Sequence, residues 1–167
     1  VPSFDKPPNQ SQMNELTIKP PSGRIGYFVG WGICILILSM FYVGYQQSPE
    51  LGWSLVVTWV LINGGLSALG ATLALAHPVS ILAAFIAAPL TSLNPTIGAG
   101  IVVGLVESYL RKPKVTDFER LRDDISSFPM WWKNGVVRVL LVFFFANVGS
   151  AVGTYVAGAS IIQQILS

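Results

Sequence analysis

The chain has 167 residues, of which 52% are hydrophobic and 11% charged, and its mean hydropathy is +0.60. Soluble domains carry about 25% charged residues, so this composition excludes an ordinary soluble protein and predicts an all-α integral membrane protein. The formal net charge is +2, and we expect no nucleic-acid partner. The single cysteine, Cys34, lies inside an apolar run and excludes both a disulfide and a cysteine metal cluster within the chain.

The first part of the chain is polar and proline-rich. Pro7-Pro8 and Pro20-Pro21 indicate an extended linker over residues 1–24. The chain begins with Val1, so we expect it to be the C-terminal part of a protein whose soluble domain precedes this linker. Residues 25–167 then form one helical membrane domain.

Three uncharged or nearly uncharged runs are long enough to cross a bilayer. They are Ile25–Tyr45, Trp53–Ala76 and Val136–Ile165. The last run is longer than one straight crossing requires. Its glycines, Gly149, Gly153 and Gly158, predict that the helix ends or bends before Ala159.

Between the second and third spans lies a broken helical hairpin. Its apolar arms, Val79–Leu90 and Thr96–Leu110, would each extend only about 18–22 Å as helices, against a hydrocarbon core of about 30 Å. A polar segment ending in Asn94 and Pro95 separates the arms and disfavours helix. We predict a re-entrant or short hairpin with Asn94 and Pro95 at its turn. Broken backbone at membrane depth must be covered by protein or line a water-filled cavity.

A polar loop, Pro113–Gly135, follows the hairpin. Thr116 and Glu119 match a capping box, and apolar residues from Phe118 to Phe128 recur at helical spacing. The pattern predicts a short amphipathic helix on the membrane surface.

The basic residues predict the orientation. All ten flank the N-terminus or the polar loop: Lys6, Lys19, Arg24, Arg111, Lys112, Lys114, Arg120, Arg122, Lys133 and Arg138. The positive-inside rule places the N-terminus and residues 113–135 in the cytoplasm and the C-terminus outside.

Polar residues within the apolar runs are the candidates for function. Asn63, Asn94 and Asn147 either bond neighbouring helices or line a polar path beside the hairpin. Glu107 is spaced to pair with Arg111 near the interface, and His77 is expected to cap the C-terminus of the second span. We find no catalytic motif and expect no metal or other cofactor.

Small residues predict close helix packing. Gly26/Gly30, Gly100/Gly104 and Gly149/Gly153 form three pairs at a spacing of four, and Gly65 and Gly70 lie in a run rich in small residues. Three such pairs predict a homo-oligomer. The runs after Asn63 and Asn147 also resemble each other, which leaves open an inverted repeat or chance recurrence.

Three stretches of the sequence carry a resemblance to a known family. They are WVLINGGLSALGATLALAHP at 59–78, AAPLTSLNPTIGAGIVVGLVESYLRKPKVTDFERLRDDI at 87–125, and VVRVLLVFFFANVGSAVGTY at 136–155. Together they resemble the C-terminal membrane region of the TraB family, the pheromone-shutdown (TraB/PrgY) proteins of archaea and bacteria. The most specific parts are LNPT at 93–96 and LRKP at 110–113.

The resemblance implies a prokaryotic, and more specifically an archaeal, cell membrane. It also implies an N-terminal soluble domain related to metalloproteases, whose motifs this chain lacks, so any hydrolase activity would lie in that domain. Two hypotheses follow. The chain is either a membrane anchor for the soluble domain or a small channel or transporter unit whose path is lined by the broken hairpin.

Overall fold

The computed structural model describes residues 24–94 and 97–167, and its helices are arranged around two long antiparallel ones. The long helices are α2 (Arg24–Gln47), α3 (Pro49–Leu73) and α8 (Gly135–Leu166). The shorter elements are α4 (Pro78–Thr91), α5 (Ala99–Arg111), α6 (Val115–Glu119), α7 (Leu121–Ile125) and the 3-10 helix η1 (Phe128–Met130). The prediction of an all-α chain with three helices of membrane-spanning length is confirmed over the described residues.

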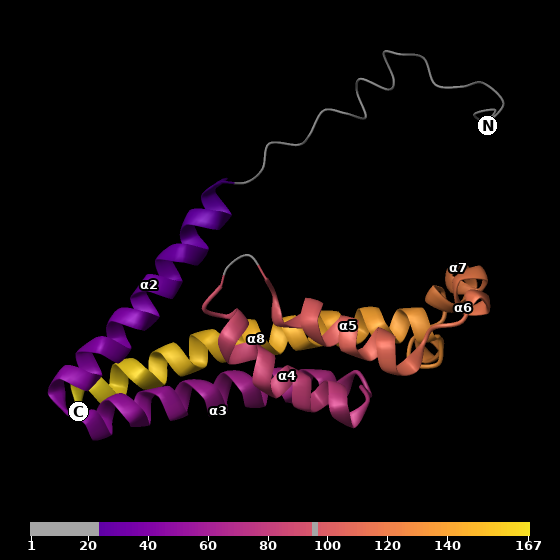
Figure 1. Cartoon of the computed structure of the whole chain (residues 1–167). Helices are drawn as coiled ribbons and strands as arrows, with labels where there is room; N and C mark the ends of the chain where they lie inside the picture. The colour runs from indigo at the N-terminus through magenta and orange to yellow at the C-terminus, as the bar shows by residue number, and fades with distance from the viewer. Residues whose placement is uncertain (1–23, 95–96) are drawn as a thin grey trace, which may run out of the picture.

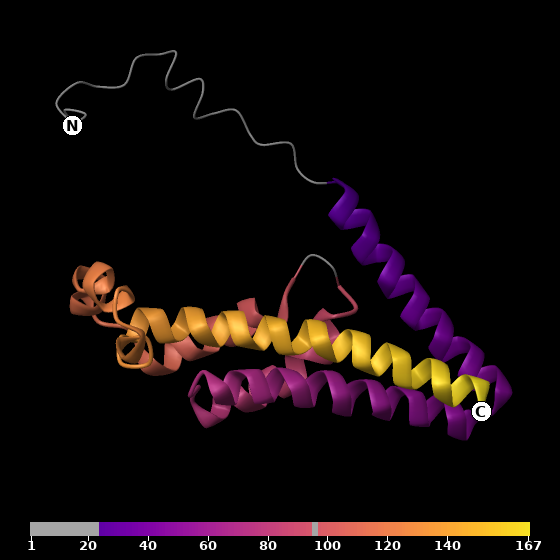
Figure 2. The ribbon, with the colours of Figure 1, turned by 180° about the vertical axis from the view of Figure 1, so that it is seen from behind.

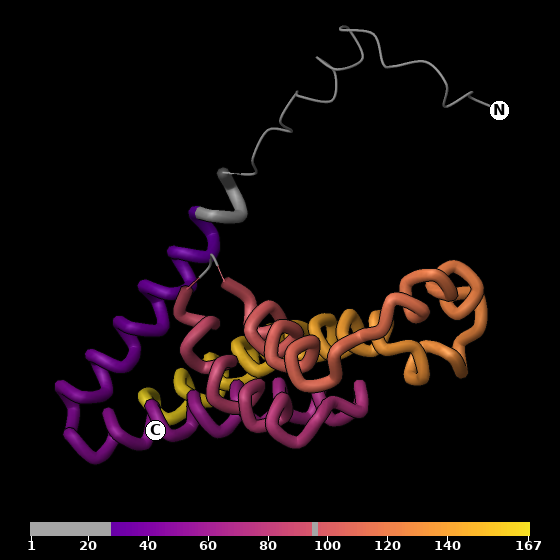
Figure 3. Tube along the Cα trace, turned by 45° about the vertical axis from the view of Figure 1, so that its right-hand side comes forward, coloured from indigo at the N-terminus to yellow at the C-terminus, as the bar shows by residue number. Residues whose placement is uncertain are grey.

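α3 and α8 lie side by side and run in opposite directions (Figures 1 and 2). α4 packs on α3, α5 packs on α8, and α4 and α5 pack on each other. The helix α2 joins α3 at Ser48 and diverges from the other helices toward its own N-terminus (Figures 1 and 3). We call the end that carries the α3–α4 turn and residues 112–134 the loop end.

Glycines bring the backbones of α3 and α8 into contact. A Cβ atom at Gly70 would lie 2.2 Å from the carbonyl oxygen of Phe145, and one at Gly149 would lie 2.3 Å from that of Leu66. A Cβ at Gly153 would lie 2.7 Å from the Cα atom of Asn63. Since these distances leave no room for any side chain, the helix pair requires glycine at all three positions.

Two of the glycine pairs predicted to drive self-association are therefore used inside the chain. Gly149 and Gly153 pack on α3, and a Cβ at Gly100 would lie 2.1 Å from the carbonyl oxygen of Phe143 in α8. Gly104 makes an ordinary contact with Phe143. These two pairs pack within the chain, and the self-association expected through them stays a prediction. The third pair, Gly26 and Gly30, belongs to α2, and the surroundings of Gly26 lie outside the described part of the chain.

The last span differs from its prediction. α8 is one helix of 32 residues that continues through Gly158 to Leu166. Of the two predicted alternatives, an end before Ala159 is wrong, since α8 is continuous and the fully buried Ala157 and Ile161 pack its final turns, while a bend stays a prediction. A glycine inside a helix costs about 1 kcal/mol relative to alanine, which such packing offsets.

The junction between α3 and α4 also corrects a prediction. α3 ends at Leu73, and Leu75 adopts a left-handed conformation with φ of 56°. His77 is not the C-cap of α3 but the N-cap of α4, where its Nδ1 atom accepts a hydrogen bond from the Val79 amide at 3.2 Å. Pro78 holds His77 in the extended conformation that an N-cap needs.

The predicted surface helix is present as two helices of five residues each, α6 and α7. α6 begins at Val115, and the Lys114 amide donates to the Asp117 carboxylate at 2.9 Å, so the capping box predicted at Thr116 and Glu119 is wrong. Asn134 ties this segment to α8: its Nδ2 atom donates to the Asp117 carbonyl and the Asp124 carboxylate, both at 2.8 Å.

Two substitutions in α3 test the role of backbone contact. Gly70→Ala should lower the free energy of unfolding by about 1–3 kcal/mol, because the new methyl group meets the backbone of α8. Gly65→Ala is the matched control, since a Cβ there meets nothing within 4 Å. It should leave stability unchanged or raise it by up to about 1 kcal/mol. Denaturant titration of the chain in mild detergent measures both, and equal effects would contradict the contact.

Candidate functional site: a buried polar cluster beside the helical break

Asn63 is the centre of a polar cluster that joins three helices. Its side chain is fully buried, and Nδ2 donates to Ser92 Oγ and Thr154 Oγ1, each at 3.0 Å. Its Oδ1 atom accepts from Ser92 at 3.2 Å and from Ser150 at 3.1 Å. One amide thus links the middle of α8 and the C-cap of α4 to α3.

The hydroxyl groups of this cluster also have partners. Thr154 donates to the carbonyl of Ser150 at 2.9 Å, and the hydroxyls of Ser92 and Ser150 are 3.0 Å apart. Both amide hydrogens and both oxygen lone pairs of Asn63 are in use, which is the full capacity of that side chain. The cluster is therefore closed by its own hydrogen bonds and needs no ligand to satisfy it.

Asn147 acts as a cap for a helix other than its own. α5 begins after Gly98, which has no side chain to cap it, and Asn147 Oδ1 accepts the amide of Gly100 at 2.9 Å. A Cβ at Gly98 would lie 2.7 Å from the same oxygen. The two glycines thus allow α8 to approach the first turn of α5 and supply its cap.

The third predicted asparagine, Asn94, lines a pocket at the break. The pocket has a volume of about 240 Å³, and its polar lining includes Ser92, Asn94, Asn147 and Thr154. A second pocket of about 180 Å³ shares Ser92 and Thr154 and extends to Gly30 of α2. We call the two pockets together the crevice. Pro95 lies outside the described residues, so its predicted place at the turn stays a prediction.

α4 contains a second proline that the sequence interpretation missed. Pro89 lacks an amide hydrogen, so the carbonyl of Phe85 loses its helical donor. Gly64 of α3 packs against that carbonyl, and a Cβ there would lie 2.5 Å from the oxygen. The buried Trp59 donates its indole hydrogen to the Pro89 carbonyl at 3.1 Å. A proline within an apolar run was the available signal.

Glu107 and Arg111 form the predicted ion pair at the loop end. Arg111 Nε lies 2.7 Å from Glu107 Oε1, and the carboxylate is fully buried. Its Oε2 accepts the His77 amide at 2.9 Å, and Arg111 also donates to the Leu75 carbonyl at 3.1 Å. The pair therefore holds the α3–α4 turn against the end of α5, and His77 takes part through its backbone.

Arg138 lies beside this pair at the start of α8. It interacts electrostatically with both Arg111 and Glu107, and its Nη2 atom donates to the Trp132 carbonyl. Trp132 in turn donates to the carbonyl of Leu73 at 3.2 Å.

No group of three or more histidine, cysteine, aspartate or glutamate residues that could hold a metal is present in the described part of the chain.

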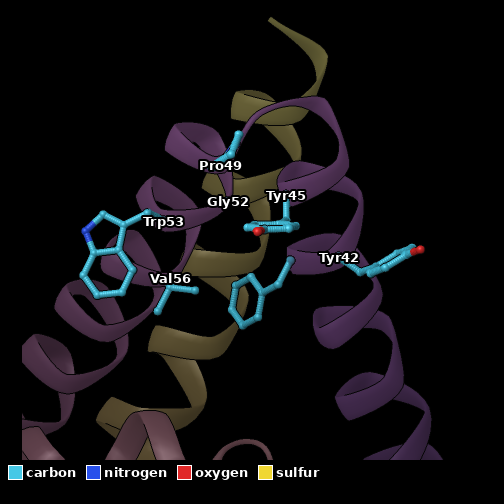
Figure 4. Close-up of a pocket in the computed structure, with 7 residues that line it drawn as sticks. Tyr42, Tyr45, Pro49, Gly52, Trp53 and Val56 are labelled. Carbon is cyan, nitrogen blue, oxygen red and sulfur yellow. The ribbon is translucent and has the colours of Figure 1, made fainter.

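An apolar pocket of about 470 Å³ lies between α2 and α3 where they join (Figure 4). Tyr42, Tyr45 and Trp53 are among the residues that line it, and all three are exposed. Its aromatic lining is typical of a membrane interface rather than of a catalytic centre.

Replacing Asn63 tests the polar cluster. Asn63→Leu removes the partner of three hydroxyl groups and should lower the free energy of unfolding by about 2–3 kcal/mol. The control is Gln46→Leu, which removes an exposed amide that bonds Tyr42. It should change stability by less than about 0.5 kcal/mol. Denaturant titration of both variants would contradict the role of Asn63 if their losses were equal.

Comparisons with known proteins identify a relative and a family profile. The chain is 32% identical over 149 residues to an uncharacterized protein of Methanocaldococcus jannaschii. The match covers 86% of this chain but 37% of that protein, so the chain spans little more than a third of its relative. No solved structure matches the chain. The family profile described as "TraB family protein, C-terminal domain" matches residues 25–166, and the chain therefore belongs to the TraB family through this domain.

Proposed function

We propose that this domain anchors a TraB protein in the cell membrane, with its soluble, hydrolase-like domain attached through residues 1–24. The observation that carries the proposal is the closed hydrogen bonding around Asn63. Asn63, Ser92, Ser150 and Thr154 satisfy one another at the centre of the helix bundle. A polar cluster whose role is to hold helices together needs no ligand beyond these mutual hydrogen bonds.

The outer surfaces of the long helices support membrane insertion. Large apolar side chains are exposed along α2, α3 and α8, which in water would be a strong aggregation hazard. Examples are Phe28 at 70%, Leu73 at 66% and Phe144 at 57% exposure. Hydrocarbon accommodates such side chains without penalty.

The lengths and contacts of α4 and α5 support a hairpin that reaches only part of the way across. Helices of 14 and 13 residues extend about 21 and 20 Å. Ser92, just before the break, bonds Asn63 and Ser150, and Ser150 lies near the middle of α8. If α3 and α8 cross the bilayer, the turn between α4 and α5 lies near its midplane.

The packing above and below the polar cluster favours an anchor over a channel. Toward the C-terminus of α8, the cluster is bordered by buried Leu55, Trp59 and Ile161. Toward the loop end it is followed by an apolar core that includes Ala71, Val103 and Val142. Apolar side chains therefore border the cluster on both sides along the bundle axis. Of the buried polar residues outside it, Ser67 donates to the Ala146 carbonyl at 3.0 Å, and Ser80 Oγ has no hydrogen-bond partner in the described part of the chain.

The crevice favours a second candidate function, a small transporter unit. Ser92, Asn94 and Asn147 line its larger pocket, and its smaller pocket shares Ser92 and extends to Gly30 of α2. A route would require α2 to move relative to α8.

Reconstituted vesicles distinguish the two functions. The whole chain should stay in the membrane pellet after extraction at alkaline pH, as an anchor must. Vesicles that contain it should release potassium ions and small neutral solutes no faster than protein-free vesicles. Faster release that is lost in Asn147→Leu would support the transporter instead.

Cysteine labelling tests the predicted orientation. In intact cells, an impermeant thiol reagent should label Gln47→Cys, which is exposed at the α2–α3 connection, and not Ser126→Cys, which is exposed at the loop end. Gln47 is preferred to Ser48 because the Ser48 hydroxyl caps α3. Labelling of Ser126→Cys alone would reverse the orientation.

A further inference from the structure

The loop end carries more positive than negative charge at one place between α5 and α8. Arg111 pairs with the buried carboxylate of Glu107 and donates to the Leu75 carbonyl. Arg138 donates to the Trp132 carbonyl, and Trp132 donates to the carbonyl of Leu73, so both arginines lie near the α3–α4 turn. Glu107 pairs with Arg111 through Oε1 and accepts the His77 amide through Oε2, while Oε1 makes no hydrogen bond within the described part of the chain. Arg138 is repelled by Arg111 and attracted by Glu107, with no carboxylate of its own within ion-pairing distance in the described part of the chain.

The hydrogen bonding of Arg138 is incomplete. A guanidinium has five N–H donors. Nη2 donates to the Trp132 carbonyl, whereas the buried Nε atom has no partner among the described residues. A buried donor without an acceptor costs about as much as a lost hydrogen bond, and such a donor is often part of a site for an anion.

The surroundings of these arginines match the depth at which lipid headgroups lie. Trp131 and Trp132 precede Arg138 by seven and six residues, and the Trp132 carbonyl accepts from Arg138. On α5, the large side chains of Leu105 and Tyr109 are 66% and 78% exposed. Tryptophan and tyrosine concentrate at the membrane interface. The exposed Lys112 and Lys133 flank the two arginines.

We propose that Arg111 and Arg138 form a binding site for the phosphate of an anionic membrane lipid between the ends of α5 and α8. A phosphate oxygen would accept from the donors of Arg138 left unpaired by Trp132, and its charge would relieve the repulsion between the two guanidinium groups. Arginine suits this role because its planar fork matches phosphate oxygens. Basic pockets between membrane helices bind anionic headgroups in this way. The proposal rests on the membrane insertion proposed above.

Lipid retention measured by native mass spectrometry tests the site. The whole chain is purified in detergent with equal amounts of phosphatidylglycerol and phosphatidylcholine. It should retain phosphatidylglycerol in preference, and Arg138→Gln should reduce that retention at least about fivefold. The matched control is Arg122→Gln, which removes the same charge from an exposed position on α7 and should leave retention unchanged.

Arg111→Gln alone would leave Glu107 buried without its partner and could unfold the loop end. The double variant Glu107→Gln, Arg111→Gln avoids this and should also lose the preference for phosphatidylglycerol. Equal retention by Arg138→Gln and Arg122→Gln would overturn the lipid site while leaving the anchor proposal intact. Displacement of the lipid by millimolar inorganic phosphate would show a site for free phosphate and overturn the lipid assignment. Retention of neither lipid would overturn the lipid site, whereas the anchor proposal fails only if the chain leaves the membrane pellet at alkaline pH.

Discussion

The structure depends on hydrogen bonds to the polar backbone and side-chain groups at one interruption, the break between the short helices α4 and α5. α4 and α5 stop beside the middle of α3 and α8, where their end groups must find hydrogen-bond partners. From α3, Asn63 forms hydrogen bonds with Ser92 at the end of α4 and with Ser150 and Thr154 in α8. From α8, Asn147 caps the first turn of α5. Two asparagines on neighbouring helices therefore hold both sides of the break.

This arrangement is possible because glycine brings the helices close together. The side chains of Asn63 and Asn147 are short. They reach their hydrogen-bond partners on neighbouring helices only if the backbones of those helices lie close to their own. Gly153 packs directly on Asn63, and Gly98 and Gly100 pack on Asn147. The close approach of α3 and α8 at Gly70 and Gly149 aligns the two helices over their length. The same glycines therefore allow both the close helix packing and the hydrogen bonds of the two asparagines.

Much of this architecture could be predicted from the sequence. Apolar length predicts the three long helices, and a polar segment with proline predicts the interruption. The spacing of four between Glu107 and Arg111 predicts their ion pair, which is present. The three asparagines stand out because amides are rare in apolar runs, and the structure places them in and around one pocket.

Partners that are distant in sequence could not be predicted. Nothing in a linear pattern indicates that Asn147 caps α5, or that the backbone of His77 rather than its imidazole meets Glu107. A small-residue pair looks the same in sequence whether it packs within one chain or between two, so the packing of Gly149 and Gly153 on α3 could not be predicted from their spacing. Glycine frequency likewise favours an end to α8 at Gly158, whereas burial of Ala157 and Ile161 decides that the helix continues.

The central claim is that the break between α4 and α5 lies near the bilayer midplane, and spin-label accessibility tests it most directly. Leu90, 67% exposed, lies just before the break, and Tyr109, 78% exposed, lies at the loop end of α5. Each is replaced by a spin-labelled cysteine in a Cys34→Ser background, and the chain is reconstituted in vesicles. The account predicts that the label at 90 is reached by oxygen and not by a water-soluble nickel complex, while the label at 109 is reached by both. Equal access of the nickel complex to both labels would contradict the account.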